Sequence, residues 1–166
     1  MKYFLITVFS FLSLFVSRLN AQNNLGKADD AVRIALNVYV PEQAEPLPDI
    51  AASLLKDKIA QMITPYGLSG SDPNARFIIV PVVSVLGKEV TATAPAMTVL
   101  SMSVSLYIGD GFEGIKFSSA SFSSKGVGAN ETKAYIDALK KIKSNDPSIK
   151  SFIDNGKNKI IEYYNS

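Results

Sequence analysis

Alternating apolar and polar positions predict a β-hairpin in the middle of this chain. Within Met97–Ile108, every second residue from Thr98 onward belongs to the face that we expect to be buried, and serines dominate the opposite face. Such alternation is typical of a strand with one buried and one solvated face. Gly114–Ser124 is expected to form the partner strand. Gly109-Asp110-Gly111 predicts the tight turn between them, in which glycine supplies a positive φ.

Two further strands are predicted before this hairpin. Ala31–Val40 alternates between aliphatic and more polar residues, and Arg76–Leu86 is strongly apolar. Pro81 is expected to bend the second of these strands, because proline cannot donate a ladder hydrogen bond. Gly87–Ala96 is rich in small residues and predicts either a loop or an extended arm of a hairpin.

Three segments have the apolar spacing of a helix. Asp49 is expected to cap a helix that runs to about Thr64, with Ile50 on its buried stripe, and Pro65–Gly67 ends it. Asn130 is expected to cap a second helix that runs to about Ser144. A third helix is predicted from Asp146 to about Tyr164.

The resulting order is strand, helix, strand, strand, strand, helix, helix. It predicts an α/β fold (an α+β sandwich) with a three- to four-stranded mixed sheet and about three helices. Six residues on the apolar stripes are expected in the core, and they are Leu54, Ile59, Ile79, Leu106, Leu139 and Ile153.

The first 21 residues have the three parts of a secretory signal peptide. Lys2 supplies a positive start, Tyr3–Val16 is apolar, and Ala21 is a small residue at which a signal peptidase can cut. The apolar run is too short to span a membrane comfortably. We therefore expect an exported bacterial protein, periplasmic or extracellular, that begins at Gln22. Residues 22–30 are expected to be a flexible lead-in, and residues 31–166 a single domain.

The chain contains no histidine and no cysteine, which excludes several kinds of chemistry. Metal sites built on imidazole or thiolate cannot form, nor can Ser-His-Asp or Cys-His catalysis. We expect no cofactor and no metal. Without cysteine, a bacterial lipid anchor is not expected either.

Charge is unevenly distributed along the chain. Residues 22–115 carry six Lys or Arg and ten Asp or Glu, whereas residues 116–166 carry nine and five. The predicted mature chain is therefore neutral overall, which argues against a nucleic-acid partner. The asymmetry raises the hypothesis that copies of the chain stack head to tail.

Several segments carry a resemblance to a known fold family. They are RFIIVPVVSV, SMSVSLYIGDG, FSSASFSS and KGVGANETKAYIDALKKI, which together run from Arg76 to Ile142. In this order they resemble the periplasmic α/β domain of curli-secretion channel proteins, of the activator lipoproteins of penicillin-binding proteins, and of the N-terminal part of TolB. The signal-peptide end and the GVG…NE…AY…AL pattern are also similar to small secreted Bacteroidetes-type proteins.

The resemblance implies the fold and an envelope location, but not a pore or an activator role. The relatives that form channels or activate synthases are usually lipoproteins, and this chain has no cysteine to lipidate. A channel also needs long membrane-spanning hairpins, and Gly87–Ala96 is too short to supply one.

Lys125, Gly126, Gly128 and Asn130 form a candidate anion or partner site. Glycines before a helix N-terminus can cradle a phosphate, with a lysine beside it. The favoured alternative is that the glycines let the chain turn from sheet to helix while Asn130 caps the helix. Asn130 also begins a glycosylation sequon, although capping is its expected role.

Other motifs are weaker. Ser53 and Lys56 have the Ser-x-x-Lys spacing of penicillin-recognising enzymes, but no Lys-Thr-Gly strand follows, and a solvated helix face is expected. Asp110 and Glu113 flank a turn but are too few to hold calcium.

The sequence therefore favours a non-enzymatic interaction or assembly module of the cell envelope, which binds another envelope protein or itself. Two alternatives stay open: a small-ligand or anion binder at Gly126–Asn130, and a hydrolase that uses carboxylates and lysines. A deep pocket that gathers two of Asp49, Asp57, Asp110 and Glu113 would favour the hydrolase.

Overall fold

The computed structural model describes residues 34–68, 70 and 75–165, which belong to one compact unit. The expected leader (1–21), the lead-in (22–30) and residues 31–33 of the first predicted strand lie outside the described residues.

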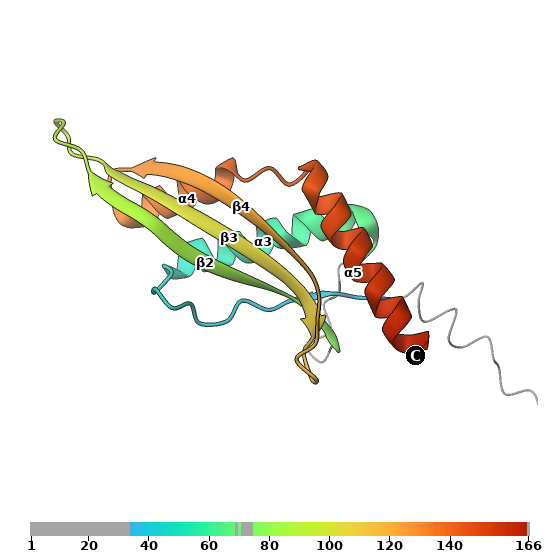
Figure 1. Ribbon diagram of the computed structural model, residues 1–166. Coiled ribbons are helices and arrows are strands. Elements are labelled where there is room, and N and C mark those ends of the chain that lie inside the picture. Colours follow the sequence, from blue (N-terminus) through green and yellow to red (C-terminus); the bar gives the residue numbers. More distant parts are fainter. Residues whose placement is uncertain (1–33, 69, 71–74, 166) are drawn as a thin grey trace, which may run out of the picture. The chain divides into compact units, whose positions relative to one another are not determined.

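Four strands form one mixed sheet in the order β1-β2-β3-β4 (Figure 1). The short strand β1 (Asn37–Val38) pairs in parallel with β2 (Phe77–Val90). Strands β3 (Thr98–Asp110) and β4 (Lys116–Gly128) continue the sheet in antiparallel fashion. The predicted mixed sheet is confirmed.

Within the described residues, three α-helices pack on one face of this sheet. They are α3 (Asp49–Ile63), α4 (Glu131–Lys141) and α5 (Pro147–Asn165), and a 3-10 turn η1 (Thr64–Tyr66) follows α3. In Figure 1, α3 and α4 lie behind the strands and α5 crosses near one end of the sheet. The predicted order, strand, helix, strand, strand, strand, helix, helix, is confirmed.

The core lies between the helices and the face of β3 that the sequence predicted to be buried. Alternate residues of β3 from Leu100 to Ile108 are buried, and the serines between them lie on the opposite face. Five of the six predicted core residues are buried, whereas Leu54 packs against the core while partly exposed. The opposite face carries cross-strand rows of serine, such as Ser105 opposite Ser121.

The start of α3 differs from the prediction. Pro48 is the N-cap and makes no capping hydrogen bond through its side chain, and Asp49 is the first helical residue. The buried stripe begins at Ala51 and recurs at Leu55 and Ile59. One residue is about 100° of helix rotation. Ile50 therefore points into solvent and is 66% exposed.

The first two strands also differ from the prediction. Within residues 34–40, the described part of the first predicted strand, only Asn37–Val38 pairs as a strand with β2. Strand β2 is continuous through Pro81, where the sequence predicted a bend. The side-chain amide of Gln43 lies beside this stretch of β2. Its Nε2 donates to the Pro81 carbonyl at 3.3 Å, and its Oε1 accepts from the Val83 N–H at 2.7 Å. It thus occupies the place of a neighbouring peptide group.

Beyond this stretch, β2 extends past Leu86 to Val90, with a register shift between Val85 and Gly87. Of the two predictions for Gly87–Ala96, the extended hairpin arm is the correct one.

The predicted turn at Gly109-Asp110-Gly111 is wrong in detail. Strand β3 continues to Asp110, and the positive φ of 69° falls on Gly114. The connection to β4 is therefore the longer loop Gly111–Ile115.

Candidate functional site

A buried carboxylate fixes the loop Gly111–Ile115, which we call the hairpin tip. Asp110 is 2% exposed. Its Oδ1 accepts hydrogen bonds from the N–H groups of Phe112 at 2.8 Å and Glu113 at 3.1 Å. Its backbone carbonyl accepts another from the N–H of Gly114 at 2.9 Å. Three successive backbone donors of the tip are therefore bound to one residue.

Arg76 ties the tip to the start of β2 and the end of α5. Phe77 pairs with Asp110 in the sheet, so Arg76 lies next to this carboxylate, and its Nε donates to Oδ2 at 2.6 Å. Its Nη2 donates to Glu113 Oε1 and to the Tyr163 hydroxyl, both at 3.0 Å. That hydroxyl donates to Glu113 Oε2 at 2.5 Å. We call Arg76, Asp110, Glu113 and Tyr163 the tip cluster.

Aromatic rings surround the guanidinium of Arg76. Its central carbon lies 5.5 Å from the ring centroid of Tyr163 and 5.9 Å from that of Tyr164, within the range of cation–π attraction. Tyr164 contacts Phe77 edge-on, with centroids 5.6 Å apart, and Tyr163 contacts Phe117 at 5.7 Å. The C-terminal end of α5 is thus packed against β2 and β4 at the base of the tip.

Hydrogen bonds and burial shift the pKa values of two members of the tip cluster. Burial raises the pKa of Asp110, but the hydrogen bond from Arg76 and those from the backbone outweigh it, so the pKa is lowered. The hydrogen bond from Tyr163 to Glu113, together with burial, raises the pKa of the phenol. At neutral pH, Asp110 is therefore a carboxylate and Tyr163 a neutral hydrogen-bond donor.

The hairpin tip carries a solvent-exposed aromatic side chain. Phe112 is 74% exposed, more than any other large apolar residue in the described part of the chain. Its backbone is fixed by Asp110, and the neighbouring Gly111 N–H donates to the Arg76 carbonyl at 2.8 Å. The chain therefore presents Phe112 on a well-anchored loop.

A mainly apolar depression of about 240 Å³ lies at the base of the tip. Gly109 forms part of its lining, and a Cβ at this position would lie 2.8 Å from the Ile115 carbonyl oxygen. The ammonium of Lys116 lies 5.5 Å from the ring centroid of Tyr107. We call this feature the depression, and its main side chains are Ile78, Val80, Tyr107, Ile115 and Lys116.

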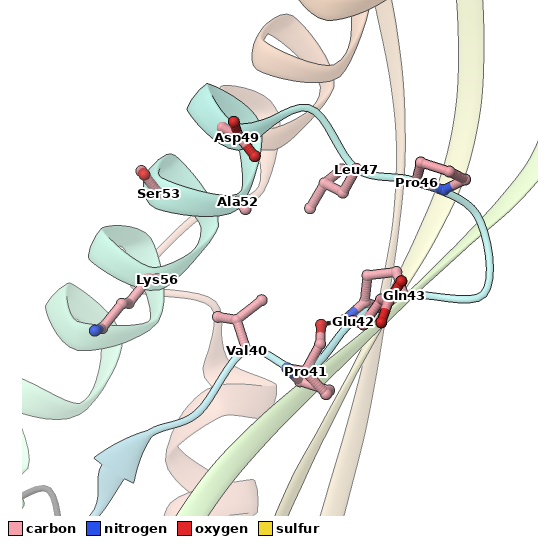
Figure 2. Close-up of a pocket in the computed structure, with 10 residues that line it drawn as sticks. All are labelled: Val40, Pro41, Glu42, Gln43, Pro46, Leu47, Asp49, Ala52, Ser53 and Lys56. Carbon is pink, nitrogen blue, oxygen red and sulfur yellow. Dashed lines mark hydrogen bonds between the residues drawn. The ribbon is translucent and has the colours of Figure 1, made fainter.

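A larger cavity of about 450 Å³, the groove, lies between α3 and the segment 40–47. In Figure 2, Val40 and Leu47 face the space between the helix and this segment. Ser53 and Lys56 both line the groove, but in Figure 2 their polar ends point away from the segment. No hydrogen bond joins the two side chains within the described part of the structure, so the pair lacks the contact that a nucleophile and its base need.

Neither the groove nor the depression gathers two of the four carboxylates of the hydrolase hypothesis. Asp49 lines the groove, whereas Asp57 is exposed on α3. Asp110 and Glu113 meet at the tip, where both are bound to Arg76. Among the described residues, no group of three or more acidic side chains is placed to hold a metal ion.

The structure gives the glycines of the predicted anion site a packing role. Gly126 and Gly128 lie inside β4, not in a loop, which corrects the predicted break before the helix. A Cβ on Gly126 would lie 2.0 Å from the carbonyl oxygen of Ala134, and one on Gly128 would lie 2.4 Å from the nitrogen of the same residue. The glycines therefore let β4 and α4 approach closely.

The other members of that site have partners of their own. Asn130 caps α4, as predicted, by accepting from the Lys133 N–H at 2.9 Å. The Val127 N–H donates to Asp137 at 2.8 Å. Lys125 is exposed, and its carbonyl accepts from Lys141 Nζ at 3.1 Å. An anion at this site would have to compete with the Asn130 and Asp137 side chains.

Sequence reasoning found Asp110 and its turn role but missed Arg76, Phe112 and Tyr163. Arg76 is 34 residues from Asp110 and 87 from Tyr163 along the chain. The sequence signal for Arg76 is its position at the start of an apolar strand. Its pairing with Asp110 can be inferred only when the strand register is known.

No protein-family model and no curated protein matches this sequence. The fold is similar to that of several crystal structures of bacterial proteins. One is a candidate lipoprotein from Caulobacter crescentus CB15 (TM-score 0.34, 16% identity, covering 84% of this chain and 92% of that one). Another is a minor lipoprotein from Acinetobacter baumannii (TM-score 0.39, 12% identity, 81% and 88%). A third is a lipoprotein from Neisseria meningitidis (TM-score 0.27, 10% identity, 78% and 96%).

These neighbours are lipoproteins, whereas this chain has no cysteine that could carry a lipid. The expected absence of a lipid anchor stays a prediction. None of the described helices has the length and apolar character needed to cross a membrane.

Proposed function

We propose that this chain is an exported, non-enzymatic interaction module of the bacterial envelope, and that the hairpin tip is its docking element. The observation that carries the proposal is the exposure of Phe112 on a loop whose backbone is bound to Asp110. Aromatic side chains with little conformational freedom are common anchors of protein interfaces, because little entropy is lost when they are buried.

The tip cluster supports a positioning role for its charged groups. The Asp110 side chain is fully buried in its ion pair, and Glu113 is shared between Arg76 and Tyr163. Groups engaged in this way stiffen the loop and are poorly placed for proton transfer to a substrate. The absence of histidine and cysteine from the sequence supports the same reading.

The two alternative functions have less support. The groove contains only one of the four carboxylates whose pairing would favour a hydrolase. At Gly126–Asn130, the Lys133 and Val127 N–H groups are already bound to side chains. Thermal stability at millimolar phosphate or nucleotide tests the binder alternative, since a clear rise would support it.

Affinity capture from envelope extract tests the proposal, with the wild type compared with Phe112→Ala. We expect a captured protein whose yield falls about tenfold or more in the variant, as for an interface anchor. Ile50→Ala is the matched control, because Ile50 is also a large, exposed apolar residue but lies on α3. Equal capture by the wild type and both variants would contradict the proposal.

A further inference from the structure

Phe112 and the depression lie next to each other at one end of the sheet. We propose that the partner of the hairpin tip is a second copy of this chain, with Phe112 of each copy seated in the depression of the other. This inference rests on the proposed function, because it names the partner of the same docking element.

The depression has the size and the chemistry to accept a phenyl ring. Its volume is about 240 Å³, and apolar protein cavities of about 150 Å³ are large enough to bind benzene. Ile78, Val80 and Ile115 contribute aliphatic surface, and Tyr107 contributes an aromatic one. Burying a phenyl ring there removes apolar area from water on both copies.

Charge also matches across such a contact. Glu113 follows Phe112 directly, and the tip cluster holds two acidic side chains for one guanidinium. Both Lys116 and Asp110 line the depression, and because Asp110 is paired with Arg76, Lys116 contributes the unbalanced positive charge there. When Phe112 of one copy enters the depression, the acidic tip arrives beside the Lys116 ammonium of the other copy. Complementary charges of this kind favour one orientation over others.

The proximity of anchor and depression predicts the symmetry of the pair. A two-fold contact buries the same patch of both copies, so each Phe112 is buried and each depression is filled in the same dimer. Two aromatic anchors bury roughly 300–500 Å² of their own surface, well below a standard interface of about 1,600 Å². The association is therefore expected to be weak and concentration-dependent.

Sedimentation velocity from tens of micromolar to about one millimolar tests the proposal, because weak dimers populate within this range. We expect the wild type to shift from monomer to dimer. Phe112→Ala, which lacks the anchor, and Val80→Glu, which places a charge in the depression, should each weaken dimerisation about tenfold or more. Leu86→Ala, at a residue 65% exposed toward the other end of β2, should leave it unchanged.

Mixing the two disabled variants gives a sharper test. Each variant alone has no complete contact, whereas a mixed pair has one, formed by Phe112 of the Val80→Glu chain and the depression of the Phe112→Ala chain. Dimers should therefore form better in the mixture than in either variant alone. If Val80→Glu does not fold, Lys116→Glu takes its place, because it reverses the charge at the depression.

Two results would overturn the inference: a wild type that stays monomeric throughout, or a dimer that Phe112→Ala leaves intact. The proposed function would survive a monomeric wild type if Phe112→Ala still abolished capture of a different envelope protein. If the wild type stayed monomeric and Phe112→Ala did not reduce capture, both the inference and the proposed function would be wrong.

Discussion

The close approach of β4 and α4 predicts a large effect of a single methyl group. In Gly126→Ala, the new Cβ would lie 2.0 Å from the Ala134 carbonyl oxygen and 2.5 Å from the Ala138 nitrogen. Both neighbours are backbone atoms inside a helix, so neither can rotate away. The helix or the strand must move as a unit.

The size of this effect follows from the geometry. An ordinary contact begins near 3.4 Å, so the Cβ would fall about 1.4 Å short of an acceptable distance from the carbonyl oxygen. A shift of that size would loosen the packing of Ala134, Ala138 and Leu139, which are all fully buried. Overpacking a core costs about 1–3 kcal/mol and more where backbone must move. We expect a loss of at least about 3 kcal/mol, or a fall of roughly 10 °C in Tm.

Thermal and urea denaturation followed by circular dichroism measure this effect. Gly87→Ala is the matched control, because it also adds one methyl group to a strand but meets nothing within 4 Å. It should be neutral or slightly stabilising. If Gly126→Ala were as stable as Gly87→Ala, the packing role of Gly126 would be refuted. If it were stable but had lost phosphate binding, the anion site would be favoured instead.

Three further predictions address the core, the tip cluster and a helix cap. Leu106→Ala should lower the unfolding free energy by about 2–5 kcal/mol. Ser105→Ala, on the open face, should change it by less than about 0.5 kcal/mol, and similar losses in the two variants would mean that the buried face is wrongly assigned. The pKa of Asp110 is lowered in the folded state, so its stabilising contribution is present above about pH 4 and is lost as pH falls through the folded value. Denaturation between pH 7 and pH 2 should therefore show a weaker acid dependence for Asp110→Asn, and an unchanged profile would contradict the ion pair with Arg76. Asn130→Ala removes the acceptor for the Lys133 N–H and should cost about 1 kcal/mol in urea denaturation, whereas no loss would contradict the cap.

The sheet and its buried face could be predicted because strand periodicity is a local signal. In β3, residues that face the helices alternate with residues that face solvent. The apolar and polar residues of the sequence from Leu100 to Ile108 alternate in the same way. The glycines of β4 were harder to interpret. Gly126 and Gly128 suggested a turn, but the requirement for them comes from Ala134 and Ala138 on the next helix, which only the packed structure brings near.

The helix starts show a second limit of sequence patterns. Ile50 and Ala51 both fit an apolar stripe, and the choice between them depends on the rotation of α3 against its neighbours. Asp49 suggested a cap, yet the chain enters the helix at Pro48.

The candidate site could be predicted only in part. Asp110 was recognised as a turn residue from its neighbouring glycines, and its hydrogen bonds to Phe112 and Glu113 agree with that role. Its partner Arg76 and the more distant Tyr163 are brought together by strand register and by the docking of α5. Neither effect leaves a local trace in the sequence.

Site-specific photo-crosslinking at position 112 tests the central claim most directly. A photoreactive phenylalanine analogue replaces Phe112 in the full chain, and the same analogue replaces Ile50 as the control. The account predicts a crosslinked product in the envelope from position 112 and little from position 50. A product of twice the mass of the chain would identify a second copy, whereas another mass would identify a different protein. Absence of any product from position 112, or equal products from both positions, would contradict the account.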